Sequence, residues 1–115
     1  MSRTFLILIL ALFPFTYATA WDHLTFQIFT GIPGQKVYFA SELDEWNAQS
    51  HPMVEFSPGN YRITIEEPWL HELQYKFVVD GVWSPDSTNP LTTSDGQGGL
   101  NSLLKITSFQ EDPLL

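Results

Sequence analysis

The 115-residue sequence has no cysteine, which excludes a disulfide framework, a lipid-modified cysteine and a cysteine-based metal site. Stability must therefore come from packing of the apolar side chains. Basic residues are also few: 5 Lys and Arg stand against 13 Asp and Glu, for a formal net charge of −8. Because nucleic-acid binding depends on neutralising phosphates with Lys and Arg, no nucleic-acid partner is expected. An uncharged ligand is compatible with this composition.

Long hydrophobic runs are also missing. The longest begins at Phe5 and ends at Phe15, and its roughly 11 residues fall well short of the ~20 that a membrane-spanning helix needs. Arg3 precedes this run and the small residues Ala18 to Ala20 follow it. This order predicts a secretory signal peptide over residues 1–20, rather than a membrane anchor. We expect a secreted or periplasmic protein that begins at Trp21 and has no membrane contact after cleavage.

Helical periodicity is absent from the remaining sequence, and apolar residues recur with period two. Turn signals such as Pro33-Gly34, Pro58-Gly59 and Asp80-Gly81 separate these runs. Short strands with regular turns predict an all-β fold, an antiparallel β-sandwich, over residues 21–107 and a tail without strand pattern over 108–115. The residues expected to be buried are Phe26, Ile28, Val37, Phe39, Ile63, Ile65, Tyr75, Phe77, Val79 and Ile106.

One hairpin can be predicted in register. Asp80-Gly81 flanked by alternating residues is a strong signal for a two-residue hairpin loop. Val79 then pairs with Val82 and Val78 with Trp83, and directly paired residues share a face of the sheet. Alternation therefore places Lys76, Val78 and Trp83 on the face opposite the core, where a tryptophan needs either a cover or a ligand. A long loop over residues 84–99 follows and frames this face.

Three stretches resemble a known family: VYFASELDEWN (37–47), YKFVVDGVWSPD (75–86) and NPLTTSDGQGGLNSLLKI (89–106). Their order and spacing are similar to those of the glycogen-binding domain of the AMP-activated protein kinase β subunit and of the related family 48 carbohydrate-binding modules. The resemblance implies an immunoglobulin-like early-set β-sandwich. It also implies a non-catalytic module that binds an α-glucan such as glycogen, starch or a maltooligosaccharide.

In that family two tryptophans stack on the glucan, and a lysine and an asparagine bind its hydroxyl groups. The resemblance places these carbohydrate-binding roles on Trp46, Lys76, Trp83 and Asn101. The sequence departs from the family at Ser41, where a glycine is usual, and near Gln97, where the kinase subunit has a leucine.

The chemistry of these residues suits an α-1,4-linked glucan or another neutral oligosaccharide. A pyranose has an apolar C–H face that a flat indole covers, and a rim of hydroxyls that Lys and Asn side chains can bind. The alternative for Trp46 and Trp83 is that they only cover an outer sheet face. The matching alternative for the whole chain is a protein-interaction module of the same fold that docks a partner, such as a carbohydrate-active enzyme, without binding sugar.

Other chemistry has little support in the sequence. His23, His51 and His71 lack metal-ligand spacing, and we interpret them as surface residues. The acidic residues before Trp46 are interpreted as a solvated loop, and Trp69 as a cap at one end of the sandwich. We therefore expect no catalytic residue, no metal site and no cofactor.

Overall fold

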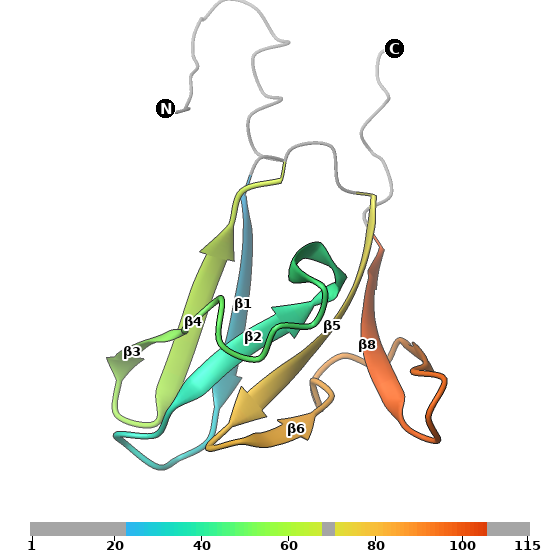
Figure 1. Cartoon of the computed structure of the whole chain (residues 1–115). Helices are drawn as coiled ribbons and strands as arrows, with labels where there is room; N and C mark the ends of the chain where they lie inside the picture. The colour runs from blue at the N-terminus through green and yellow to red at the C-terminus, as the bar shows by residue number, and fades with distance from the viewer. Residues whose placement is uncertain (1–22, 68–70, 106–115) are drawn as a thin grey trace, which may run out of the picture. The chain divides into compact units, whose positions relative to one another are not determined.

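The computed structural model describes residues 23–67 and 71–105 (Figure 1). The signal peptide, the tail over 108–115, the expected cap at Trp69 and the expected burial of Ile106 lie outside these residues. The chain divides into two compact units, one formed by residues 1–26 and 64–69 and the other by 27–63 and 70–115. In the described part of the first unit, the hydroxyls of Thr25 and Thr64 lie 3.0 Å apart, and His23 Nε2 lies 3.3 Å from Glu66 Oε2. The candidate site lies in the second unit.

The strands form two sheets. The first has the order β1 (Leu24–Phe29), β4 (Asn60–Ile65), β3 (Val54–Ser57). The second has the order β2 (Val37–Ser41), β5 (Glu72–Val79), β8 (Leu100–Lys105), β7 (Thr92–Ser94), and β6 (Val82–Ser84) also pairs with β5. The pairs β2–β5, β3–β4, β5–β6, β5–β8 and β7–β8 are antiparallel.

This architecture confirms the predicted antiparallel β-sandwich. Within the described residues, helical structure is limited to a three-residue 3-10 turn, η2 (Glu42–Asp44). Accordingly, the described part of the chain holds no helix with the length and apolarity needed to cross a membrane.

The core of the second sheet is built on the odd-numbered residues of β2 and β5. The rings of Phe39 and Tyr75 stack with centroids 5.4 Å apart, and Phe77 meets them edge-on at 6.3 and 5.9 Å. These three rings are buried, as period-two alternation predicts.

Most of the expected core is confirmed, but part of it is wrong. The predicted residues that are buried are Phe26, Val37, Phe39, Ile65, Tyr75 and Phe77. Ile28, Ile63 and Val79 are only half-buried. Ile28 lies on the edge strand β1 and Val79 borders the hairpin turn, so both have fewer neighbouring side chains than a central position has.

The β5–β6 hairpin has the predicted register. Val79 pairs with Val82 and Val78 with Trp83, with Asp80 and Gly81 as the loop residues. Both loop residues have positive φ, 49° and 83°, as the tight turn that matches strand twist requires. The Asp80 carboxylate accepts hydrogen bonds from the Lys36 amide and the Gln35 side chain, both at 2.9 Å. The tip of the hairpin is thereby fixed to the segment that enters β2.

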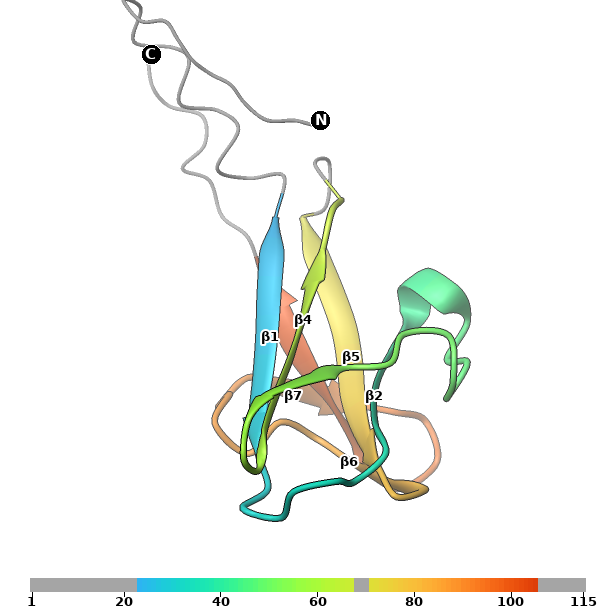
Figure 2. The same cartoon turned by 90° about the vertical axis from the view of Figure 1, so that its left-hand side faces the viewer.

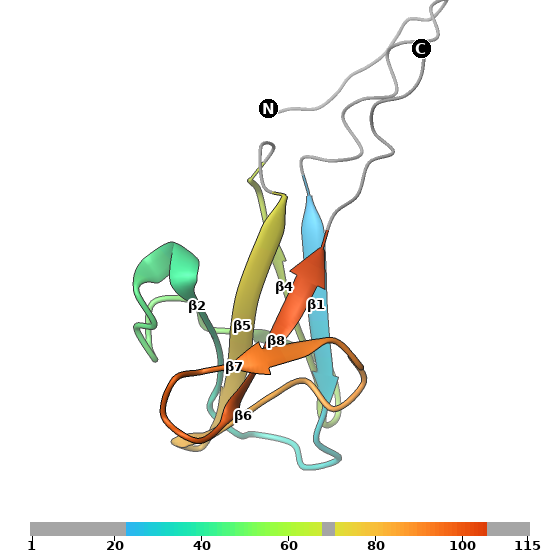
Figure 3. The same ribbon diagram turned by 90° about the vertical axis from the view of Figure 1, so that its right-hand side faces the viewer.

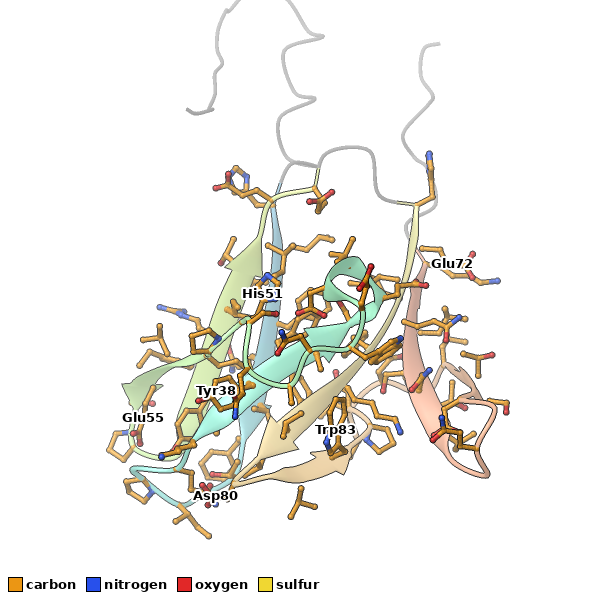
Figure 4. The ribbon with its side chains drawn as sticks, in the orientation of Figure 1. Tyr38, His51, Glu55, Glu72, Asp80 and Trp83 are labelled. Atoms are coloured by element: carbon orange, nitrogen blue, oxygen red, sulfur yellow. The ribbon has the colours of Figure 1, made fainter. Side chains whose placement is uncertain are left out.

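Lys76 and Trp83 share the outer face of this sheet, but the face is less open than the sequence indicated. Val78 pairs with Tyr38 on one side and Trp83 on the other, and it is only 3% exposed. Ala40, which pairs with Lys76, is also buried. Two aromatic residues thus flank a covered valine on this face, and Figure 4 labels them on β2 and β6. Trp83 itself remains 42% exposed.

The expected loop over residues 84–99 contains a strand that the sequence did not reveal. β7 pairs with β8, and the loops on both sides of β7 are visible in Figure 3. The first of these loops is anchored to the core: the Tyr75 hydroxyl donates to Asp86 Oδ2 at 2.8 Å, and Asn89 Nδ2 donates to the Tyr75 oxygen at 3.0 Å. Burial raises the pKa of Tyr75 well above its ordinary value.

Replacing Phe77 with alanine should lower the free energy of unfolding by about 3–5 kcal/mol, because it removes a fully buried ring and leaves a cavity. Urea denaturation monitored by circular dichroism measures the change. Val54→Ala, at a residue that is 65% exposed, is the control and should shift stability by no more than ~0.5 kcal/mol. Equal stability of the two variants would show that the core face is wrongly assigned.

Candidate binding site

A pocket of about 480 Å³ opens on the outer face of the second sheet. Its lining residues are Trp46, Lys76, Trp83, Asp95, Gln97 and Asn101. The four carbohydrate-binding residues expected from the sequence therefore meet around one pocket, although they come from four separate segments. The volume falls within the range usual for small-molecule sites.

Trp46 is placed by the turn that follows β2, which stands to one side of the strands in Figure 2. Ser41 caps η2: its side chain accepts from the Leu43 amide, and Asp44 completes a capping box. Glu45 and Trp46 then both adopt left-handed backbone conformations, with φ of 58° and 63°. Such conformations are costly for residues other than glycine, so surrounding contacts must hold them. One such contact is the hydrogen bond from the Trp46 amide to the Ser41 carbonyl at 2.8 Å.

The Asp44 carboxylate fastens this turn. Its Oδ2 lies 2.7 Å from His51 Nδ1 and accepts a hydrogen bond from the Ser50 hydroxyl, and its Oδ1 accepts from the Ser41 amide at 3.4 Å. Burial by itself would raise the pKa of Asp44, but the hydrogen bonds from Ser50, His51 and Ser41 outweigh it and hold the pKa below its usual value.

This arrangement corrects two interpretations made from the sequence. Asp44 is not part of a solvated acidic loop, because its side chain is only 12% exposed. His51 is half-buried and paired rather than a free surface residue. Both corrections come from the same contact, which joins residues seven apart across a turn. No local pattern in the sequence signals this contact.

Lys76 is paired inside the pocket. Its Nζ lies 3.1 Å from Asp95 Oδ2. Asp95 Oδ1 accepts hydrogen bonds from the amides of Gln97 at 2.7 Å and Gly99 at 2.9 Å. These amides, followed by the Lys76 ammonium, lower the pKa of Asp95. A Cβ at position 99 would lie 2.6 Å from Asp95 Oδ2, so any other residue there would displace the carboxylate oxygen that pairs with Lys76.

Asn101 supplies a polar group to the pocket and is only 6% exposed. Its Nδ2 donates to Gln74 Oε1 at 3.0 Å, which orients the amide. Within the described residues no hydrogen bond engages its Oδ1. The pocket therefore offers an acceptor held in place by a neighbouring strand.

Sequence reasoning did not assign Asp95 to the site. The segment Ser94-Asp95-Gly96 did carry a usable signal, since Asp before glycine commonly accepts hydrogen bonds from amides two residues on. The partner Lys76 lies 19 positions away and had no such signal. Gln97, where the family resemblance would lead one to expect a leucine, lines the pocket and contributes a polar side chain. No group of three or more potential metal ligands occurs within residues 23–67 and 71–105.

A β-sandwich that presents two tryptophans, a paired lysine and a fixed amide around a shallow pocket has the form of a carbohydrate-binding module. Comparison with known families gives the same class. The model of the glycogen recognition site of AMP-activated protein kinase matches residues 25–112. The chain belongs to this family, and the resemblance drawn from the sequence is confirmed.

Several curated proteins are similar to the chain. The subunit beta-1 of 5'-AMP-activated protein kinase from Rattus norvegicus is 32% identical over 79 residues, which is 67% of this chain and 27% of that protein. The Sus scrofa subunit is 32% identical over 73 residues, 64% of this chain and 56% of that protein. Protein FLOURY ENDOSPERM 6, chloroplastic, from Oryza sativa subsp. japonica is 32% identical over 76 residues, 65% of this chain and 13% of that protein. The chain thus spans only part of the length of these relatives.

Asp44→Asn keeps the shape of the side chain but removes its charge, and should lower the free energy of unfolding at pH 7 by about 1–2 kcal/mol, because hydrogen bonds to an ionised group are lost. Since the folded pKa is depressed, the wild-type contribution is present above the unfolded pKa of about 3.9 and is lost as pH falls through the folded value.

Urea titrations at neutral and strongly acidic pH test this expectation. The two proteins should differ at pH 7 and converge in acid. Glu45→Gln, an exposed neutral substitution in the same turn, is the control and should match the wild type throughout. A constant difference between Asp44→Asn and wild type at all pH values would contradict the role of the Asp44 charge.

Proposed function

We propose that the chain is an exported, non-catalytic module that binds α-glucans such as glycogen, starch or maltooligosaccharides. The observation that carries the proposal is the meeting of Trp46, Lys76, Trp83 and Asn101 around one pocket. Membership of a family described by its glycogen recognition site supports the ligand class.

The indole rings would cover the apolar faces of glucose units. Trp83 is 42% exposed, although it is a large aromatic residue. Trp46, which also lines the pocket, is half-buried. Each indole also carries an N–H donor. Exposed aromatic surface in a pocket is uncovered apolar area that a flat, partly apolar ligand can bury.

The polar groups suit hydroxyls rather than a charged ligand. Among the described residues that line the pocket, the single cation, Lys76, is paired with the single anion, Asp95. An anionic ligand would have to compete with Asp95, whereas sugar hydroxyls can add to the remaining Lys76 donors and to Asn101 Oδ1. The overall charge of −8 also disfavours anionic ligands.

The arrangement supports binding without catalysis. Glycoside hydrolysis commonly requires a pair of carboxylates on either side of the scissile bond. Within residues 23–67 and 71–105, Asp95 is the single carboxylate that lines the pocket, and its oxygens already accept from Lys76, Gln97 and Gly99. Binding to such an open site should be weak, micromolar or poorer, because association entropy and displaced water offset much of the gain.

Export is the part of the proposal that depends on residues outside the described structure. It is supported by the order of basic, apolar and small residues over positions 1–20. Amino-terminal sequencing of protein recovered outside the cytoplasm should give Trp21 as the first residue. An intact Met1 on membrane-held protein would show instead that the segment acts as an anchor.

Trp83→Ala should weaken binding of maltoheptaose at least about tenfold, because a central tryptophan commonly dominates the affinity of such a site. Isothermal titration calorimetry measures the affinity. The matched control is Phe56→Ala, which removes an aromatic residue of similar exposure, 39%, from β3 in the other sheet. This control should bind like the wild type.

Cellooligosaccharides of equal length test the ligand class, since they differ from maltooligosaccharides in linkage alone. They should bind more weakly or not at all. If the folded wild type binds neither sugar and is not retarded in native gels containing glycogen, the glucan proposal is wrong. A protein-interaction module of the same fold would then be the better explanation.

A further inference from the structure

A second hollow, of about 240 Å³, also reaches Trp83. Among its lining residues are Lys36, Tyr38, Gln49, Val78, Asp80 and Trp83. Trp83 lines the candidate pocket as well, so the two hollows share this residue. The segment from Trp46 to Gln49 also contributes to both, with Trp46 in the first and Gln49 in the second.

The floor of this hollow is a row of paired residues across three strands. Tyr38 on β2 pairs with Val78 on β5, which pairs with Trp83 on β6. Neighbouring strands lie ~4.8 Å apart, so Tyr38 and Trp83 stand roughly 10 Å apart at their backbones with Val78 between them. Because Val78 is only 3% exposed, the apolar surface that a sugar ring could meet here comes from the two flanking aromatic side chains.

The polar groups around this floor have unused hydrogen-bonding capacity. Within the described residues, no hydrogen bond or ion pair engages the Tyr38 hydroxyl, the Gln49 side-chain amide or the Lys36 ammonium. Asp80 differs from them, because both of its carboxylate oxygens accept hydrogen bonds from residues 35 and 36. In the first pocket, too, part of the hydrogen-bonding capacity is used, since its lysine is paired with Asp95.

The balance of charge favours the same class of ligand in both hollows. The described lining of the second hollow contains one cation and one anion, Lys36 and Asp80, whose formal charges cancel. A neutral, hydroxyl-rich chain that leaves the first pocket over Trp83 meets free donors and acceptors here without passing a charged barrier.

We infer that a bound α-glucan continues past Trp83 into the second hollow, where Tyr38 and Gln49 contact its further glucose units. This inference rests on the proposed function and adds an extended subsite to it. It makes the module selective for longer chains, because only they fill both hollows.

A length series from maltose to maltoheptaose, titrated into the full protein by calorimetry, tests the inference. Wild-type affinity should rise with chain length beyond the length that fills the first pocket. Tyr38→Ala should reduce the affinity for maltoheptaose about twofold to tenfold, the usual effect of one aromatic contact, and leave that for the shortest binding chains unchanged. Tyr38→Phe and Gln49→Ala should show the same dependence on length with smaller losses.

The variants are chosen so that a folding defect is separable from a binding defect. Gln49 is exposed, and Tyr38→Phe keeps an aromatic ring at the position that pairs with Val78. Phe56→Ala serves again as the control and should behave like the wild type at every length. Losses by Tyr38→Phe and Gln49→Ala that are equal at all lengths, or absent at all lengths, would overturn the subsite. Failure of the wild type to bind any chain would instead refute the proposed function itself.

Discussion

The register of the β5–β6 hairpin is the constraint on which the candidate site depends. Because side chains alternate along a strand, a slip of one residue would move Lys76 and Trp83 relative to each other onto opposite faces. The Asp80-Gly81 turn prevents the slip: both residues have the positive φ that this two-residue loop needs, and Asp80 is hydrogen-bonded to the start of β2. Tyr38, Val78 and Trp83 are brought into one row by the same register.

The loops that complete the site are held by carboxylates. Asp44 fastens the turn that carries Trp46, and Asp95 organises the loop from residue 95 to 99. Away from the site, Glu55 accepts from the amides of Gly34 and Gly59 at 3.0 and 2.9 Å, and these bonds lower its pKa.

In a chain without disulfides, these hydrogen bonds from backbone amides to carboxylates hold the loops of a small β-sandwich in place. Part of the excess of Asp and Glu over Lys and Arg therefore has a structural role, in addition to giving the surface its negative charge. Each of the three carboxylates has a lowered pKa, so the loops should weaken together in strong acid.

The sequence was sufficient for the fold class, for the face assignment of Tyr75, Phe77, Lys76 and Trp83, and for the hairpin register, because these follow from period-two alternation and one turn motif. It did not reveal β7, whose three residues lie among turn signals and pair with β8. It also missed the Asp44–His51 and Lys76–Asp95 pairs. Such contacts depend on how loops fold back in space, and nothing in the local pattern of the sequence encodes them.

Binding of a glucan at Trp46 and Trp83 can be followed through the four indole N–H resonances of the protein, by heteronuclear NMR during titration with maltoheptaose. Single Trp→Phe variants assign the resonances. A shared binding pocket predicts that the Trp46 and Trp83 resonances shift together along one saturable curve, because both residues line it. Shifts confined to Trp21 or Trp69, or separate curves for Trp46 and Trp83, would contradict it.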